Sequence, residues 1–548
     1  MKLLNLKIGQ TKNGFRSLPP GFSIQFRSLN DLQSMSKFNP FCFAGLNGSG
    51  KSNVLEALSA IFCHMEFSTA VFTPESFKKY FDAKKCSPDA FELTYLIAPK
   101  SSDANDMENF VRVRISKEEN KEPAVFILPY PFDGTKKERK IPLAKETKLY
   151  LPDHVIAYSS GENEVLSLPY RKCRLVHLDE YIQGIKNNYE KYTEPENSLI
   201  FIDNNMSQAV LLACLLFENE ETLKPIAEEA GITDIQSFRM HINFHRFNFQ
   251  QEKETAVKLL ENEQIAKLKK CATSWFADDK KIYLDFFVNK AAKEAFKNHF
   301  KTSFELFQVF RILYELNSYK IGEEIKEDVY ASKGFYTDWK LPTPSPKENI
   351  FHFLDFKIVK KIKETNKSME LLLRELSDGE HQFLHTVGIC LLMKDRRTLL
   401  LLDEPETHFN PNWRAKFIQM LYDGIESGKG NAQNAHLQKD IILTSHSPFV
   451  LSDCMPDNVI FFDANKDSRP EAKNAKELGV NTYGAGVDFI LKSFFKTGLN
   501  SAKSFTELRK IIDDGDLGEL QNAVEQFGES YEKQFLFKKI YEKMKEKK

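Results

Sequence analysis

A short segment near the N-terminus has the residue types needed to hold a phosphate group. The sequence from Gly45 to Ser52, GLNGSGKS, matches the pattern G-x-x-x-x-G-K-[ST] in full. Glycines let backbone N–H groups curl around a phosphate, Lys51 supplies a cation for the β- and γ-phosphates, and the Ser52 hydroxyl is a ligand for Mg²⁺. A chance glycine turn is the alternative. The apolar strand predicted at 41–44 and the amphipathic helix predicted at 53–62 disfavour it, because they are the flanks this motif requires.

This loop and the residue after it form a predicted nucleotide-binding set. Its members are Gly45, Asn47, Gly48, Ser49, Gly50, Lys51, Ser52 and Asn53.

A pair of acidic residues follows a predicted buried strand much later in the chain. The apolar run 399–402 leads directly into Asp403 and Glu404. Carboxylates at the end of a buried strand are costly unless a cation lies there. We therefore predict that Asp403 and Ser52 hold Mg²⁺, and that Glu404 polarises an attacking water. A strand that simply ends in solvated carboxylates is the alternative.

Two further segments carry groups that could face a phosphate. Ser377 and Glu380 have the spacing of a capping box, and Ser377 with the Gly379 amide could also bind an anion at a helix N-terminus. His446 follows the buried strand predicted at 441–444. A lone histidine there is more often structural. In company with the other three elements, we predict that it acts at the same site.

The pattern of apolar residues divides the chain into regions of different structure. Alternation with a period of two between about 90 and 160 predicts antiparallel strands, whereas long Lys- and Glu-rich stretches between about 165 and 345 predict helices. A proline-rich linker is expected at 341–346. The prediction is an α/β protein whose parts are residues 1–165 and 349–465 as two halves of one domain, 166–348 as a helical insertion and 466–548 as a helical tail.

Composition excludes several classes of protein. The 548 residues carry a formal net charge of -1, which excludes a generally basic nucleic-acid coat protein. The 8 cysteines are scattered without zinc-binding spacing, which favours a reducing compartment. No apolar run approaches the length of a membrane span, and the N-terminus does not have the pattern of a secretion signal. We therefore expect a cytoplasmic protein with no membrane contact.

The four motifs, in this order, resemble the ATPase heads of the ABC superfamily in its SMC, RecF and OLD branch. Residues 14–18 also resemble an element that opens many such heads, and 404–411 resembles their D-loop region. The resemblance implies ATP and Mg²⁺ as cofactors, Glu404 and His446 as catalytic residues, and a head-to-head homodimer. In that dimer Ser377 and Gly379 of one protomer, with Glu380 beside them, close on the nucleotide held by Lys51 of the other. Asp378 stands where the family usually has glycine.

A narrower resemblance rests on two short strings. Residues 158–164 and 481–485 look most like the PtuA-type ATPases of bacterial anti-phage systems. This resemblance implies a separate HNH-type nuclease as partner. No nuclease centre is evident in this chain, since the D-x-D string at 514–516 falls in a helical pattern. The string at 158–164 lies where a Q-loop is expected but contains no glutamine.

Three functions remain open at this stage. The first is an ATPase that regulates a nuclease or toxin in anti-phage defence. The second is a RecF-like DNA repair or recombination ATPase acting as a clamp or loader, and the third is a scaffold that binds ATP and barely hydrolyses it. Contact with DNA or RNA is predicted at 78–85, at 136–140 and at 293–301, where Phe296 and Phe300 could stack on bases. Solvated faces are the alternative for each.

Overall fold

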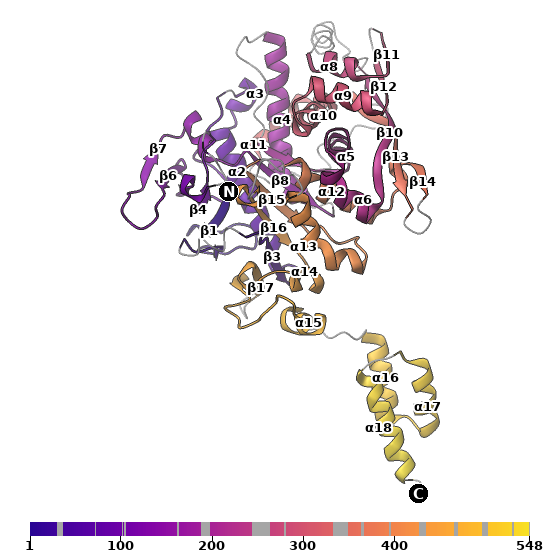
Figure 1. Cartoon of the computed structure of the whole chain (residues 1–548). Helices are drawn as coiled ribbons and strands as arrows, with labels where there is room; N and C mark the ends of the chain where they lie inside the picture. The colour runs from indigo at the N-terminus through magenta and orange to yellow at the C-terminus, as the bar shows by residue number, and fades with distance from the viewer. Residues whose placement is uncertain are drawn as a thin grey trace. The chain divides into compact units, whose positions relative to one another are not determined.

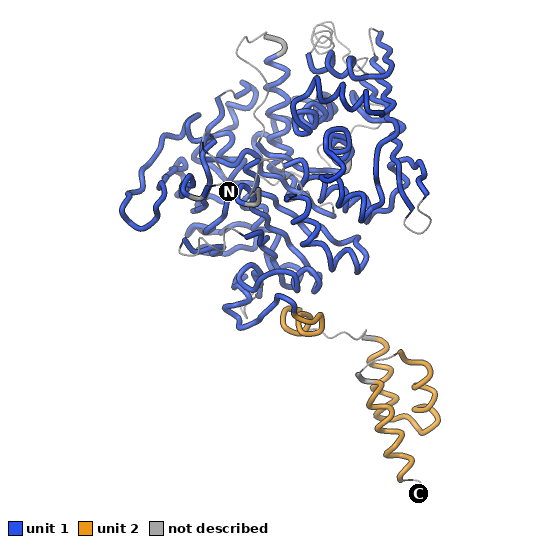
Figure 2. Tube along the Cα trace, in the orientation of Figure 1, with its two compact units in different colours: residues 1–484 blue, residues 485–548 orange. Residues whose placement is uncertain are grey.

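The computed structural model describes most of the chain. The described residues are 1–29, 37–71, 73–100, 102, 106–161, 164–187, 198–243, 263–278, 281–332, 349–362, 367–393, 396–426, 435–464, 470–495, 502–528 and 531–546. They form two compact units, residues 1–484 and 485–548 (Figure 2). The predicted linker at 341–346 lies outside the described residues. No described helix combines the length and the apolar character needed to cross a membrane.

A seven-stranded sheet forms the centre of the first unit, with strand order β18-β17-β3-β16-β15-β8-β9. Strands β3, β15 and β16 are buried along their whole length, as expected for a parallel sheet covered on both faces. Neighbours pair in parallel except at β18, which is antiparallel to β17. The strands are β3 (Phe41–Gly45), β8 (His154–Ser159), β9 (Leu199–Phe201), β15 (Thr398–Asp403), β16 (Lys439–Thr444), β17 (Val459–Ala464) and β18 (Pro470–Asn474).

Helices pack against this sheet. Helix α2 (Lys51–Ser68) follows β3 directly and contacts β3, β8, β9, β15 and β16, so its buried face is nearly continuous. Helix α12 (Asp378–Leu392) packs against α13 (Pro411–Glu426), which contacts α14 (Pro448–Ser452). Helix α4 (Glu164–Asn187) packs against α2, and α11 (Glu323–Ala331) contacts both α4 and the short helix α3 (Glu75–Lys78).

A second sheet is antiparallel and has the order β2-β1-β4-β5-β6-β7. Its strands β4 and β5 pair in register from Phe91 with Lys117 to Ile97 with Val111, which confirms the prediction made from the period of two. The strands are β1 (Lys2–Ile8), β2 (Ser23–Gln25), β4 (Phe91–Ile97), β5 (Val111–Lys117), β6 (Ala124–Pro129) and β7 (Arg139–Ile141). Together the two sheets give the α/β head with an antiparallel subdomain that the sequence predicts.

The region 166–348, expected to be helical, also contains strands. Strand β9 joins the central sheet, and β10 (Ile232–Asn243), β11 (Ser274–Ala277) and β12 (Lys281–Phe287) form a third sheet with β13 (Phe351–Lys361) and β14 (Ser368–Leu372). Strand β10 was missed because its partner β13 lies far along the chain, and β11 was missed because it has only 4 residues. The helices of this region are α5 (Asn204–Phe217), α6 (Glu220–Ala230), α8 (Glu263–Cys271), α9 (Lys290–His299) and α10 (Ser303–Glu315).

The second unit consists of helices, as the sequence predicts, but the change of structure comes later than residue 466. Strand β18 and the residues up to 484 belong to the first unit. The helices of the second unit are α15 (Val487–Phe495), α16 (Ala502–Asp514), α17 (Leu517–Gln526) and α18 (Tyr531–Glu546), and α16 to α18 share a small core of Leu508, Leu520, Ala523 and Leu536. Short 3-10 helices complete the fold at Met107–Asn109, Lys145–Tyr150, Leu316–Lys320, Leu373–Glu375, Ala435–Gln438 and Pro456–Asn458.

Candidate functional site

Adjacent parallel strands deliver the predicted residues to one edge of the central sheet. Strand β15 ends at Asp403, which is in register with Thr444 at the end of β16 and with Ser159 at the end of β8. Strand β3 pairs with the other side of β16 and leads into the phosphate loop. Carboxyl ends of parallel strands are where α/β proteins build ligand sites. The register therefore places Asp403 and Thr444 at the same edge as the loop, at the ends of strands β15, β16 and β3, which lie side by side in Figure 1.

The phosphate loop has a backbone that suits glycine. Gly45, Gly48 and Gly50 have φ angles of 140°, 77° and 96°. A Cβ atom on Gly45 would lie 2.4 Å from the carbonyl oxygen of Phe462 on the neighbouring strand β17, so no larger residue fits there. The loop therefore leaves β3 sharply and delivers its backbone to the N-terminus of α2, where N–H groups and the helix dipole favour an anion.

Two polar side chains in this loop are placed where they could bind an anion. The Lys51 ammonium donates to the carbonyl oxygens of Gly45 at 2.9 Å and Leu46 at 3.0 Å, and burial lowers its pKa. The Ser49 hydroxyl is buried and has no hydrogen-bond partner among the described residues. A buried hydroxyl without a partner is costly. Bound phosphate oxygens would satisfy both side chains, so the loop fits a nucleotide.

Two hydroxyl groups converge on Asp403. Ser52 Oγ donates to Asp403 Oδ1 at 2.9 Å, and Thr444 Oγ1 donates to the same oxygen at 2.7 Å. The carboxylate is buried at the end of β15. Hydroxyl and carboxylate oxygens are the ligands that Mg²⁺ takes beside nucleotide phosphates. Ser52 and Asp403 therefore fit the predicted magnesium site.

Glu404 and His446 face each other beside this position. His446 Nε2 lies 3.4 Å from Glu404 Oε1, and the hydrogen bond from His446 holds the pKa of Glu404 below its usual value. Glu404 has a φ of 49°, and its backbone N–H donates to Thr444 Oγ1 at 3.0 Å. Its side chain is 43% exposed, so water can reach it. The arrangement keeps an ionised carboxylate within reach of solvent, which is what a water-orienting base needs.

Comparison with known proteins gives one family match and several similar folds. Residues 242–452 match the family described as "AAA domain, putative AbiEii toxin, Type IV TA system". That stretch includes Ser377, Asp403 and His446 but not the phosphate loop. No curated protein matches the sequence.

Several solved structures are similar at low identity. The SMC head domain from Thermotoga maritima has 10% identity and a TM-score of 0.32, with 86% of this chain and 99% of that chain covered. The Smc head domain from Pyrococcus furiosus, bound to the C-terminal domain of ScpA, has 11% identity and a TM-score of 0.32, covering 87% and 98%. The recombination mediator RecF-ATPrS of the RecFOR pathway has 12% identity and a TM-score of 0.29, covering 86% and 97%.

The geometry of the site and the order of the motifs fit the binding of a nucleotide with Mg²⁺. Membership of the ABC-type ATPases of the SMC and RecF class stays a prediction. The central sheet with α2 is called the ATPase head below, after that prediction.

The signature segment caps its own helix in the ATPase head. Ser377 is the N-cap of α12, and Glu380 Oε2 accepts from the Ser377 N–H at 2.9 Å, so the capping box is confirmed. Glu380 also pairs with Lys360 of β13. A Cβ atom on Gly379 would lie 2.8 Å from the carbonyl oxygen of His408. Gly379 therefore allows the D-loop region to approach the signature helix, and the nucleotide role of these residues stays a prediction.

Asn47 and Asn53 differ in their surroundings. Asn47 lies exposed at the tip of the loop. Asn53 Oδ1 accepts from Ser17 Oγ at 2.5 Å, which ties α2 to the opening element, and Arg16 Nε lies 3.2 Å from Glu56 Oε2 one turn further along α2. The structure therefore gives Asn53 a role in fixing the start of α2, and contact of either asparagine with nucleotide stays a prediction.

Sequence reasoning assigned no role to several polar residues at this site. Thr444 donates to Asp403, and the Ser160 N–H donates to the Asp403 carbonyl at 3.2 Å. Ser160 belongs to the segment 158–164, which lies where a Q-loop is expected but contains no glutamine. Glu406 is buried, accepts from Ser445, and burial raises its pKa to about 7. In the sequence, these residues stand out only because they lie at or shortly after the end of a buried strand. That position does not show which side chain each residue will contact. Residues 162 and 163 lie outside the described part of the chain.

One predicted nucleic-acid contact is wrong. Phe296 and Phe300 are 0% and 1% exposed, and Phe296 packs against Phe286 of β12, so neither ring can stack on a base. Lys293 lies 2.7 Å from Asp234. At 78–85, Lys79 pairs with Glu327 at 2.7 Å. The sequence showed that aromatic and basic residues alternate, but not that the aromatic face points inward.

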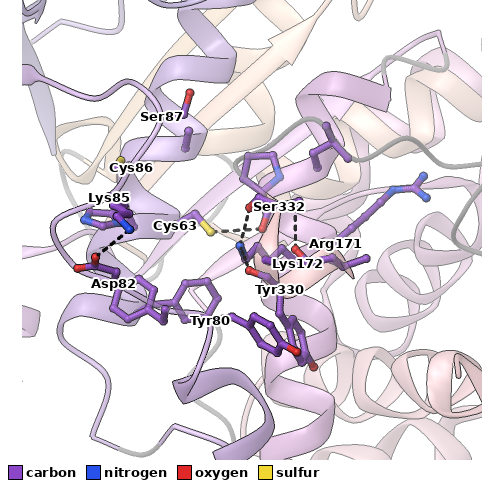
Figure 3. Close-up of a pocket in the computed structure, with 18 of the residues that line it drawn as sticks. Cys63, Tyr80, Asp82, Lys85, Cys86, Ser87, Arg171, Lys172, Tyr330 and Ser332 are labelled. Carbon is purple, nitrogen blue, oxygen red and sulfur yellow. Dashed lines mark hydrogen bonds and ion pairs between the residues drawn. The ribbon is translucent and has the colours of Figure 1, made fainter. Parts of the chain in front are cut away.

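A separate cavity lies against the far part of α2. It has a volume of about 490 Å³ and lies between α2, the segment after α3, α4 and the end of α11. Figure 3 shows Cys63 and Lys172 reaching into this region, with the Lys172 ammonium bonded to the carbonyls of Tyr330 at 2.8 Å and Ser332 at 2.9 Å. None of the residues predicted for the nucleotide site lines it. The predicted nucleotide site is therefore at the sheet edge, and this cavity is separate from it.

Proposed function

We propose that this protein hydrolyses ATP between two ATPase heads and that closure of the heads regulates a separate nuclease or toxin. The observation that carries the first part is the convergence of Ser52 and Thr444 on Asp403 beside the Glu404 and His446 pair. Each group has the chemistry that phosphoryl transfer to water requires.

Each residue has a distinct part in this proposal. Lys51 and the loop N–H groups hold the phosphates, and Ser49 donates its buried hydroxyl to them. Ser52 and Asp403 hold Mg²⁺, which when bound neutralises charge on the phosphates. Glu404 orients the attacking water and accepts its proton, and His446 holds the Glu404 carboxylate in place.

The second protomer supplies the signature residues in this proposal. Ser377 presents the N-terminus of α12, whose first-turn N–H groups favour an anion. Within one chain Glu380 of this turn pairs with Lys360, and Gly379 lies against the His408 carbonyl. A nucleotide held by Lys51 of the opposite protomer gives this helix end a ligand, so ATP binding favours the dimer.

Regulation of a nuclease or toxin rests on two supports. The matching family model carries a toxin and a type IV toxin–antitoxin system in its description, and the strings at 158–164 and 481–485 resemble PtuA-type ATPases. Unit 485–548 offers a docking surface, since Phe537, Tyr541 and Met544 follow one face of α18 and are 53%, 60% and 51% exposed.

Mixing two inactive variants tests the shared site. Lys51→Ala removes nucleotide binding and Ser377→Arg blocks the signature, so each variant alone should lack ATPase activity. In a mixed dimer, the Ser377→Arg protomer has an intact phosphate loop and meets the intact signature of its Lys51→Ala partner. We expect activity to return on mixing. Mixtures that stay inactive although the mixed dimer forms would overturn the shared site.

Further measurements separate regulation from the two other functions. Co-purification with and without ATP should recover a nuclease or toxin polypeptide whose activity depends on nucleotide. An ATPase that is stimulated by DNA alone and recovers no such partner would favour the RecF-like clamp or loader. If wild type and Glu404→Gln both turn over at the same near-zero rate, only the scaffold remains.

A further inference from the structure

Described helices cover only one of the two faces of the third sheet, which has the strand order β11-β12-β10-β13-β14. Ile282, Leu284 and Phe286 of β12 are at most 1% exposed and point toward the helices. Helices α5 and α6 contact β10, α8 contacts β12 and α10 contacts β13. In Figure 1 these helices lie on the same side of the sheet, and its other side faces the right edge of the view. The alternate residues of each strand therefore form an outer face.

One row of this outer face is made of four rings from four consecutive strands. Phe276 of β11 is opposite Tyr283 of β12, Tyr283 is opposite His241 of β10, and His241 is opposite His352 of β13. The rings of His241 and Tyr283 are stacked, with centroids 4.4 Å apart and planes at 9°. His241 meets His352 edge-on at 4.8 Å. Cross-strand partners share a face of a sheet, so the four rings form one continuous row.

The row ends at an exposed ring on an edge strand. Phe276 is 58% exposed, and Phe287 two rows away on the same face is 56% exposed. Most phenylalanines in the described part of the chain are buried, so two exposed rings on one face indicate a contact surface. The two histidines keep the row uncharged at neutral pH, because burial lowers the pKa of His241 to about 4 and also lowers that of His352.

Three cationic side chains lie on the same face as the rings. Arg239 lies in the row between Phe276 and Phe287, where it pairs with Asp285 at 2.5 Å. Lys281 precedes Tyr283 by two residues on β12, and Lys357 is opposite Ser237 in the row of Phe287. Flat uncharged rings with lysines at intervals match unpaired nucleobases joined by phosphates, since bases stack on aromatic rings and phosphates meet cations.

We propose that this outer face binds single-stranded nucleic acid, with bases extending the aromatic row from Phe276 and phosphates meeting Lys281 and Lys357. The face takes the place of the predicted contact at 293–301, whose rings are buried beneath the same sheet. The proposal goes beyond ATP hydrolysis and does not depend on it, because it uses no residue of the nucleotide site.

Adjacent residues of β11 provide a matched pair of variants. Phe276 and Trp275 are similarly exposed, at 58% and 53%, but Trp275 is opposite the buried Leu284 and lies under Lys269, so it points to the other face. We measure binding of fluorescently labelled single-stranded DNA, single-stranded RNA and duplex DNA to the full chain by anisotropy, without ATP and over a salt series. Wild type should bind single strands more tightly than duplex, and binding should weaken as salt rises.

The variants give opposite expectations. Phe276→Ala should weaken single-strand binding by about 5-fold to 100-fold, and Phe276→Trp should restore it. Trp275→Ala should bind as wild type does. Equal affinity of wild type, Phe276→Ala and Trp275→Ala, or equal binding of duplex and single strands, would overturn the proposal. ATPase activity of Phe276→Ala, measured without nucleic acid, should equal that of wild type. Weaker binding with unchanged ATPase activity would show that Phe276→Ala has lost base stacking and not the ATPase.

Discussion

Ser52 donates a hydrogen bond of 2.9 Å to Asp403, although 351 residues separate them in the chain. One stands at the first turn of α2 and the other at the end of β15. This bond joins the phosphate loop to the acidic pair, and it brings together the two side chains that we propose as ligands of Mg²⁺.

Loss of the Asp403 carboxylate should abolish metal-dependent turnover. Asp403→Asn keeps the size of the side chain but removes the charge that Mg²⁺ needs. We expect ATPase activity to fall by about 100-fold or more, because a bound metal contributes several kcal/mol to charge stabilisation. Titration of activity with Mg²⁺ at fixed ATP measures this. If Asp403→Asn has the same magnesium dependence as wild type, Asp403 is not a ligand of the metal.

His446 should set the acid limit of the ATPase. Its hydrogen bond lowers the pKa of Glu404, so that Glu404 stays ionised at a pH below its usual range. In His446→Ala this bond is lost and the pKa of Glu404 rises. The acidic limb of the rate profile should therefore move to higher pH, whereas a role of His446 in folding alone would lower the rate equally at every pH.

Thr444 should matter for its hydroxyl group and not for its shape. It donates to Asp403 and accepts from the Glu404 N–H. Thr444→Val leaves both groups without this partner, which we expect to cost about 1 to 3 kcal/mol of unfolding free energy. Thr444→Ser keeps the hydroxyl and serves as the control. Thermal melting of both variants should show a large loss for valine only; matching losses would point to packing instead.

Glu406 should make the protein less stable as pH rises through the weakly acidic range. Burial raises its pKa to about 7 in the folded state, while the unfolded value is near 4.5. The folded chain therefore holds a proton that the unfolded chain has released. Its contribution is fully present below about pH 4.5 and is lost as pH approaches 7, to a limit of about 3 kcal/mol. In Glu406→Gln the melting temperature should no longer fall with pH over this range. If it still falls, another group causes the pH dependence.

His177 should produce a similar loss in a separate pH window. Burial alone would lower its pKa, but its bond to Glu180 at 2.8 Å and its contact with Glu66 of α2 at 3.6 Å raise it to about 9. The stabilising contribution is present below about pH 6.5 and is lost as pH rises through 9. His177→Gln should flatten stability over that range. Glu406→Gln, which acts in the lower window, is the control.

The sequence predicted the parts of the nucleotide site that depend on local pattern. The glycines of residues 45–52 indicate a loop whose backbone conformation requires glycine. The apolar run before Asp403 predicts a buried strand. The capping box of Ser377 and Glu380 was equally local, because its two partners are three residues apart. Each of these features depends on neighbours within one turn or one strand, and the structure has them as predicted.

The tertiary structure decided which of these parts meet. Strand order places β16 between β3 and β15, and this alone brings Thr444 to Asp403 and His446 to Glu404. It also decided the surroundings of the rings: Phe296 and Phe300 are buried in the core, while Phe276 is 58% exposed. The composition of a segment and the spacing of its apolar residues are the same whether its rings face the core or the solvent. Only the pairing of β12 with β10, and the helices packed on one side of them, fixes which face is buried.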